Sequence, residues 1–166
     1  MENKDITIEI EKNVLNIRAA VIINHENKVL MHRDILSDHY ALLGGRVKLG
    51  ENSSETVKRE VKEEIGKEIE IKGYISTIEN FFNMKNKKYH EILFVYQGEF
   101  TSEQDKKITE TLKNIEGEKE LQYEWIKIDE LNKYPIKPES IIEVLQKQKY
   151  PVHVINDDIN KKKEMI

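Results

Sequence analysis

The sequence predicts an α/β sandwich built around a mixed β-sheet. Strand-like segments lie on both sides of one amphipathic helix that is capped by Ser53 or Ser54 and ends at Gly66, and a second helix is expected at residues 138–148. Neither an internal repeat nor a linker-like segment divides the chain. We therefore expect one domain over residues 1–155, followed by a polar tail at residues 156–166 that frays from it.

Three strand-like segments and a short apolar approach precede the first helix. Alternating apolar and polar residues predict a half-buried strand at residues 6–11, and a denser apolar run at 17–23 predicts a central strand. After a polar turn, residues 28–33 return as another strand. Residues 40–43 then form a short apolar approach to the Gly44-Gly45 pair.

The first helix has a start signal, a periodic face and a stop signal. Ser53 or Ser54 can cap its N-terminus, and Gly66 ends it. Its apolar residues recur every fourth position and so form one face that can pack on a sheet: Val57, Val61 and Ile65.

The second half of the chain continues with strands. Residues 69–82 and 89–100 predict a long hairpin, and residues 121–128 predict a further strand. The segment 101–120 is polar and weakly patterned, so we expect a functional or mobile loop. A short helical turn is expected at residues 129–131.

Composition excludes several classes of protein. The 166 residues are 38% hydrophobic and 35% charged, which is typical of a globular domain. No apolar run is long enough to span a bilayer, and the charged N-terminus is unlike a signal peptide. The absence of cysteine excludes disulfides and thiolate metal sites, and a cytoplasmic location is the simplest expectation. A net charge of −4 argues against a stable nucleic-acid partner.

Acidic residues gather in the segment from Gly44 to Gly66, which we call the loop–helix segment. Glu60 and Glu64 are four positions apart on the helix, and Glu63 lies on the adjoining edge. Such like charges repel one another, and a hard divalent cation removes that penalty. Carboxylate oxygens with positions left for water and phosphate suit Mg²⁺.

Two further features of the loop–helix segment point to a built site. Arg59 lies beside the carboxylates and can bridge back to Glu51, which would clamp the loop before the helix. Gly44 and Gly45 allow close approach of the backbone, so a main-chain carbonyl can reach the metal.

Taken together, these positions resemble the Nudix box, G-x5-E-x7-R-E-U-x-E-E-x-G-U, where U is aliphatic. The chain reads GRVKLGENSSETVKREVKEEIGK, and only Lys67 departs from the pattern. The preceding strands, the LLGGRV approach and the later YEWIKIDEL segment also resemble Nudix counterparts. The resemblance covers about residues 18–145 and implies an α/β/α sandwich with a mixed sheet.

The resemblance also implies an activity. Nudix proteins hydrolyse a nucleoside diphosphate linked to another moiety, so a small nucleotide substrate and Mg²⁺, with Mn²⁺ able to substitute, are expected. By analogy the metal ligands are Glu60, Glu63, Glu64 and the Gly44 carbonyl. The residues expected to serve catalysis are Glu63, Glu64, Arg59 and Glu51.

Residues outside the carboxylate cluster have open roles. Arg33, Arg46 and His90 are candidates for substrate contact, with a surface or packing role as the alternative for each. The general base is either a box glutamate or a glutamate of a later loop. Glu118 and Glu120 are therefore candidates for an extra metal ligand or base.

Two other functions compete with catalysis. A Nudix-like sensor would bind a nucleotide without turning it over, but such a module is expected to lose box carboxylates that this chain keeps. A non-enzymatic interaction protein explains a charged helix but not Glu51 and Arg59 in register with it. Nudix enzymes often dimerise, so a homodimer is one expected assembly.

Overall fold

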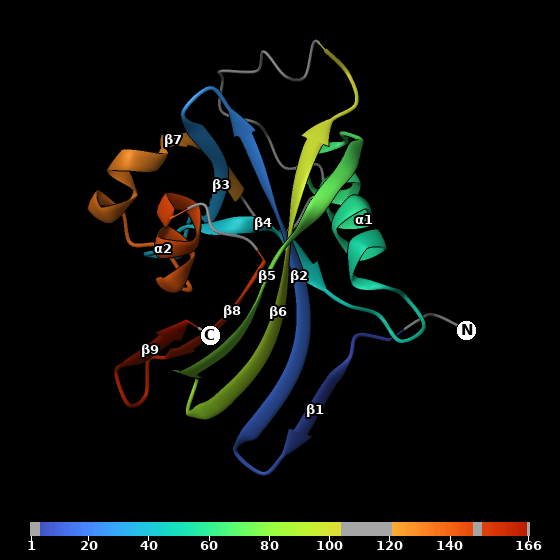
Figure 1. Cartoon of the computed structure of the whole chain (residues 1–166). Coiled ribbons are helices and arrows are strands. Elements are labelled where there is room, and N and C mark those ends of the chain that lie inside the picture. Colours follow the sequence, from blue (N-terminus) through green and yellow to red (C-terminus); the bar gives the residue numbers. More distant parts are fainter. Residues whose placement is uncertain (1–3, 104–120, 148–150, 166) are drawn as a thin grey trace.

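A computed structural model describes residues 4–103, 121–147 and 151–165, and places one mixed sheet at the centre of the molecule (Figure 1). The order across the sheet is β7-β3-β4-β2-β6-β5-β8-β9, with β1 beside β2. The strands are β1 (Thr7–Ile10), β2 (Asn13–His25), β3 (Lys28–Asp34), β4 (Ala41–Arg46), β5 (Ile69–Met84), β6 (Lys87–Phe100), β7 (Leu121–Lys127), β8 (Val152–Asp157) and β9 (Lys162–Met165).

Pairing within the sheet is mixed, as predicted. The strand pairs β2–β6 and β5–β8 are parallel, whereas the other pairs are antiparallel. The predicted long hairpin is confirmed as β5 and β6, joined at Lys85 and Asn86. Both turn residues have positive φ, which matches the right-handed twist of the flanking strands.

Helices cover the two faces of the sheet and form the outer layers. The helix α1 (Ser53–Ile65) lies on one face, and the 3₁₀ helix η2 (Ile128–Lys133) and the helix α2 (Ser140–Lys147) lie on the other (Figure 1). Strand β2 serves both layers because successive side chains point to opposite faces. Its Ala19 and Val21 join the core cluster under α1, whereas Ala20 and Ile22 join the cluster under α2. The predicted sandwich is confirmed.

The C-terminal tail differs from the prediction. Residues 156–166 were expected to fray, but β9 pairs with β8, and the expected domain boundary at residue 155 falls inside β8. The turn is held by the Asp157 carboxylate, which accepts hydrogen bonds from the backbone N–H groups of Ile159 and Asn160. Met165 packs against the α2-side core. A turn and one apolar anchor therefore hold a segment whose composition is polar.

The two helical segments predicted near the C-terminus are both present. The predicted helix at 138–148 begins later, at Ser140, and the helical turn at 129–131 is confirmed within η2. The predicted loop at 101–120 lies almost wholly outside the described residues.

Among the helices that the structure does describe, none is long and apolar enough to cross a membrane.

Candidate active site

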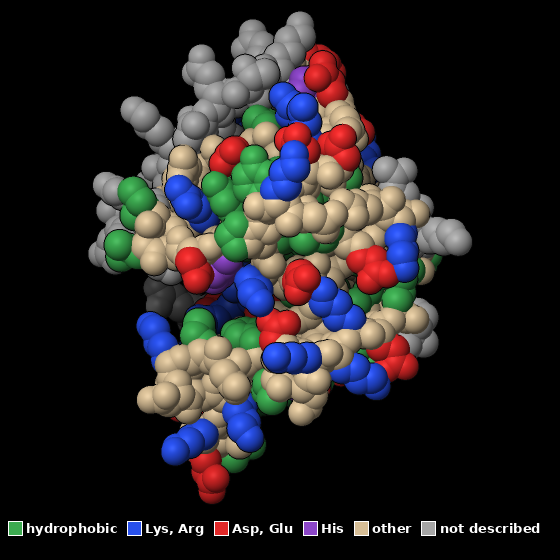
Figure 2. All heavy atoms as spheres, turned by 90° about the vertical axis from the view of Figure 1, so that its left-hand side faces the viewer, with side chains coloured by type: hydrophobic (Ala, Val, Ile, Leu, Met, Phe, Trp, Pro, Cys, Tyr) green, Lys and Arg blue, Asp and Glu red, His purple; other side chains and the backbone are tan. Residues whose placement is uncertain are grey.

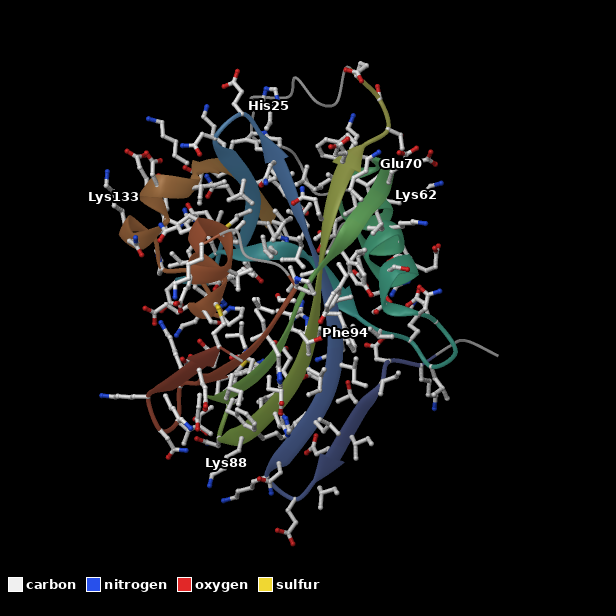
Figure 3. All side chains as sticks on the ribbon, viewed as in Figure 1. His25, Lys62, Glu70, Lys88, Phe94 and Lys133 are labelled. Carbon is white, nitrogen blue, oxygen red and sulfur yellow. The ribbon has the colours of Figure 1, made fainter. Side chains whose placement is uncertain are left out.

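The loop–helix segment runs from the end of β4 to the end of α1, and both elements lie beside β2. Helix α1 begins after Asn52, whose side-chain oxygen accepts a hydrogen bond from the Glu55 N–H at 2.9 Å. The predicted caps, Ser53 and Ser54, instead lie in the first turn, so the cap prediction was wrong by one or two residues. The predicted apolar face is fully buried against the sheet, and Lys62 projects from the outer side of the helix (Figure 3).

Arg59 is the centre of a hydrogen-bond network inside this segment. Its Nε donates to Glu51 Oε1 at 2.8 Å, and Nη2 donates to Glu51 Oε2 at 3.0 Å. Its Nη1 donates to Glu60 at 2.7 Å and to Glu63 at 2.8 Å. Nη2 also reaches the Arg46 carbonyl oxygen at 3.2 Å. One guanidinium therefore ties the loop to two carboxylates of the helix, and the predicted Arg59–Glu51 contact is present.

The Glu51 carboxylate is held strongly in its charged form. The Arg59 hydrogen bond is the largest cause, and it lowers the pKa of Glu51 to about 2. Thr56 Oγ1 donates to Glu51 Oε2 at 2.8 Å, and the Lys48 N–H donates to the same oxygen at 3.2 Å. Thr56 is fully buried and was missed by sequence reasoning, because a threonine in a helical first turn carries no signal of its own. The loop before α1 is therefore closed around Glu51.

The Glu60 carboxylate occupies space left by a glycine. A Cβ atom at Gly45 would overlap that carboxylate, so the absent side chain makes room for it. Burial raises the pKa of Glu60, and the Arg59 hydrogen bond opposes that shift. Ionising this group is therefore costly without a nearby positive charge.

Gly44 is required for a different reason. Its φ is +148°, and a Cβ there would overlap the backbone of Ala19 on the neighbouring strand β2. Its carbonyl oxygen accepts a hydrogen bond from Arg18 Nη2 at 3.4 Å. Two adjacent glycines thus bring β4, β2 and α1 into close approach beside the carboxylates.

Glu64 faces the sheet rather than solvent. It is 6% exposed, and its Oε2 lies 3.7 Å from His32 Nδ1 on β3. The His32 ring is in turn 5.7 Å from the Tyr123 ring on β7. Sequence reasoning missed His32, although it neighbours the candidate Arg33. The contact joins residues far apart in the chain, so local spacing gives no sign of it.

A model of the NUDIX domain matches residues 14–147, which is most of the chain. The chain belongs to the NUDIX family. The match includes the whole loop–helix segment, and NUDIX proteins are pyrophosphohydrolases. None of the curated proteins matches the sequence.

Solved structures of NUDIX proteins share the fold. A MutT NUDIX hydrolase from Burkholderia pseudomallei is 19% identical, with a TM-score of 0.64 over 81% of this chain and 98% of that one. An ADP-ribose pyrophosphatase from Streptococcus suis is 14% identical, with a TM-score of 0.57 over 86% and 98%. A UDP-X diphosphatase is 19% identical, with a TM-score of 0.59 over 80% of this chain and only 61% of that one.

The oxygen atoms that the loop–helix segment offers as metal ligands suit a hard divalent cation. They are carboxylate oxygens on one helix, and the Glu60 carboxylate sits in a cradle that a Cβ at Gly45 would fill. Arg59 holds Glu60 and Glu63, while Glu64 points to His32. Within residues 4–103, 121–147 and 151–165, no three His, Asp or Glu side chains converge as a metal site would. The donor chemistry fits Mg²⁺, and the Arg59 guanidinium holds Glu60 and Glu63 in this arrangement.

The predicted substrate-contact residues are dispersed around the NUDIX fold. Arg33 Nε donates to Gln122 Oε1 at 2.9 Å, and its guanidinium lies 5.3 Å from the centre of the Tyr40 ring. Arg46 lies 3.5 Å from Asp5 at the exposed end of β4. His90 lies 3.3 Å from Glu79 on β5. Arg46 borders the Arg59 network, whereas Arg33 and His90 contact other groups.

Two candidate glutamates belong to the later loop. Glu118 and Glu120 lie outside the described residues. Their role as an extra metal ligand or base stays a prediction, as do the catalytic roles assigned to Glu51, Arg59, Glu63 and Glu64.

Proposed function

We propose that this NUDIX protein hydrolyses a phosphoanhydride bond in a nucleoside diphosphate linked to another moiety, with Mg²⁺ as cofactor and Mn²⁺ able to replace it. The observation that carries the proposal is the Arg59 network, which gathers Glu51, Glu60 and Glu63 around one guanidinium. A purely structural helix does not need three acidic residues on a single cation. The family match over residues 14–147 supports the same reaction class.

The metal would be held by Glu60, Glu63 and Glu64, with the Gly44 carbonyl as a further oxygen donor. When bound, the cation neutralises the diphosphate and makes a bound water more acidic. The protein's part is to hold the donors in place: Arg59 and Glu51 fix the loop, and Gly45 gives Glu60 its space. Such positioning can supply a large part of the barrier reduction in phosphoryl chemistry.

The base that activates water is proposed to be Glu63 or Glu64, with Glu118 or Glu120 as the alternative. Glu64 is the more buried of the two helix residues, and His32 can hold its orientation from β3. Arg46 is proposed to contact a substrate phosphate. Its carbonyl oxygen accepts a hydrogen bond from Arg59, so the residue borders the Arg59 network, and its own guanidinium is half-exposed.

The substrate is proposed to be a small nucleotide derivative. The named activities of two similar structures, a UDP-X diphosphatase and an ADP-ribose pyrophosphatase, both concern a nucleoside diphosphate joined to another group. The face of the molecule that carries α2 displays acidic and basic side chains intermixed (Figure 2), which gives no uniform basic field for a nucleic acid. A cytoplasmic location and a homodimer are further predictions.

A substrate panel tests the proposal. The purified chain is incubated with Mg²⁺, and separately with Mn²⁺, and with UDP-glucose, ADP-ribose and the nucleoside triphosphates. We expect release of a nucleoside monophosphate from at least one compound, and no release after chelation of the metal. A nucleotide-binding sensor without turnover would bind a panel member and release no product, which would overturn the enzyme proposal.

A further inference from the structure

A row of buried polar side chains crosses the α2-side face of the sheet. It consists of Asn16 on β2, Glu91 on β6, Asn80 on β5 and Asn156 on β8. Each is paired in register with the next: Asn16 with Glu91, Glu91 with Asn80, and Asn80 with Asn156. Paired residues point to the same face. The four side chains are 3%, 5%, 6% and 0% exposed, so the row lies inside the molecule.

One end of the row is fully hydrogen-bonded. Asn156 Nδ2 donates to Asn80 Oδ1 at 3.0 Å, and Asn80 Nδ2 donates to Glu91 Oε1 at 3.2 Å. Asn156 Oδ1 accepts from the Ser140 N–H at the start of α2, at 3.2 Å. This end fixes α2 on the sheet, and its side chains have a structural role.

The other end of the row, at Asn16 and Glu91, has few hydrogen-bond partners. Asn16 Oδ1 is buried and has no hydrogen-bond partner within residues 4–103, 121–147 and 151–165. Among the described residues, Asn80 is the one hydrogen-bond donor to Glu91, and no basic side chain forms an ion pair with it. A buried carboxylate with a single amide partner, beside a buried unpaired amide oxygen, costs stability. Further along the same face, Leu93 on β6 and Ala20 on β2 belong to the apolar core, so this face of the sheet is elsewhere built from apolar residues.

The unpaired end is close to the candidate active site. Asn16 and Arg18 are two positions apart and point to the same face of β2, a separation of roughly 7 Å along a strand. The Arg18 guanidinium binds the Gly44 carbonyl of the loop–helix segment at 3.4 Å. A group bound against Asn16 and Glu91 could therefore belong to a molecule whose phosphates reach that segment.

We propose that Asn16 and Glu91 contact the substrate and select a group that presents two neighbouring hydrogen-bond donors. A carboxylate accepts such a donor pair through both oxygens, and the Asn16 oxygen accepts a third bond. Two parts of a nucleotide offer this chemistry: the N1–H and 2-amino edge of guanine, and the adjacent hydroxyls of a ribose or another sugar. The inference rests on the proposed function, because it assigns specificity to that reaction.

Two matched substrate pairs separate these sources. GTP and ITP differ by the 2-amino group of the base, and GTP and 2′-deoxy-GTP differ by one ribose hydroxyl. We expect the wild-type kcat/KM to fall at least about tenfold for one member of one pair, as expected for loss of a hydrogen bond to a buried charged group. If both pairs are hydrolysed with equal kcat/KM, the donor-pair proposal is wrong.

Two variants then test whether Asn16 and Glu91 cause the discrimination between the paired substrates. Asn16→Leu removes the unpaired amide, and Glu91→Gln keeps the shape and the Asn80 bond but replaces one acceptor oxygen with a donor. We expect both to lower the wild-type ratio of kcat/KM within the discriminating pair by about tenfold. The matched control is Ser76→Ala, which removes a buried hydroxyl on β5 outside the row. This hydroxyl also has no hydrogen-bond partner in the described part of the chain, and its loss should leave the ratio unchanged.

A structural role alone predicts a different result. Replacing an unpaired buried amide with leucine would then raise the melting temperature and leave the substrate ratio unchanged, and that outcome would overturn the inference. The Asn16 variant decides the matter even if the Glu91 variant does not fold. Failure of the proposed function is distinguishable, because it would appear as no metal-dependent hydrolysis by the wild type.

Discussion

Both oxygens of the Glu51 carboxylate accept hydrogen bonds from one guanidinium, that of Arg59, at 2.8 and 3.0 Å. This parallel pair of bonds joins the loop before α1 to the middle of the helix. The same guanidinium reaches Glu60 and Glu63. A planar fork with several fixed donors is needed for all of these contacts, and a lysine ammonium cannot make them together.

Replacing Arg59 with lysine should therefore reduce activity while preserving the fold. The positive charge remains, but the two-point contact with Glu51 is lost and the loop is free to shift. We expect kcat/KM to fall about 100-fold, as for a small misplacement of catalytic groups. The comparison is Lys58→Arg, at an exposed neighbouring position of α1. Wild-type activity of Arg59→Lys would contradict the assigned clamp.

The Glu51–Arg59 pair should also appear in the pH dependence of unfolding. The pKa of Glu51 is lowered from 4.5 to about 2, chiefly by the Arg59 hydrogen bond. Its stabilisation is therefore complete above about pH 4.5 and is lost as the pH falls toward 2. Urea unfolding between pH 5 and pH 2 should show a shallower loss of stability for Glu51→Gln than for the wild type. Identical pH profiles would show that the pair contributes nothing.

Gly45→Ala should disturb the site more than the fold. The added methyl group overlaps the Glu60 carboxylate, which lies at the end of a flexible side chain and can move away. We expect a lower affinity for Mg²⁺, measured by calorimetry, and a similar circular dichroism spectrum. Gly73→Ala is the control, because a Cβ at Gly73 meets nothing within 4 Å. Unchanged metal affinity in Gly45→Ala would remove Glu60 from the ligand set.

Glu60→Gln should have opposite effects with and without metal. Burial raises the pKa of Glu60 above its unfolded value, so the ionised group costs stability at a pH above the folded pKa. The neutral variant should therefore melt at a higher temperature than the wild type in EDTA at neutral pH. Mg²⁺ at 100 times its Kd should stabilise the wild type by about 2.7 kcal/mol and the variant by less. Equal stabilisation of both proteins would contradict a role for Glu60 in metal binding.

Local patterns predicted the helix and its clamp because both depend on short spacings. Val57, Val61 and Ile65 define the buried face of α1, and Arg59 follows Glu51 by eight residues. The helix cap was mislocated because Asn52, Ser53 and Ser54 are all good capping residues, and only the path of the loop selects among them.

Contacts between distant strands could not be predicted in this way. His32 meets Glu64 across the sheet–helix interface, and Asn16 and Glu91 meet only because β2 and β6 pair in parallel. The β8–β9 hairpin was missed because its turn depends on the Asp157 carboxylate rather than on a glycine. Register and tertiary packing decide the first two contacts, and neither is visible in local periodicity.

The most direct test of the account is the turnover of Glu63→Gln and Glu64→Gln beside Glu55→Gln, which changes an exposed carboxylate of the same helix. Each protein is assayed for monophosphate release on the best substrate with Mg²⁺, and its melting curve is recorded. We predict a loss of at least about 100-fold for one or both site variants, intact folding, and near wild-type activity for Glu55→Gln. Full activity of both site variants would show that the loop–helix segment does not carry the reaction.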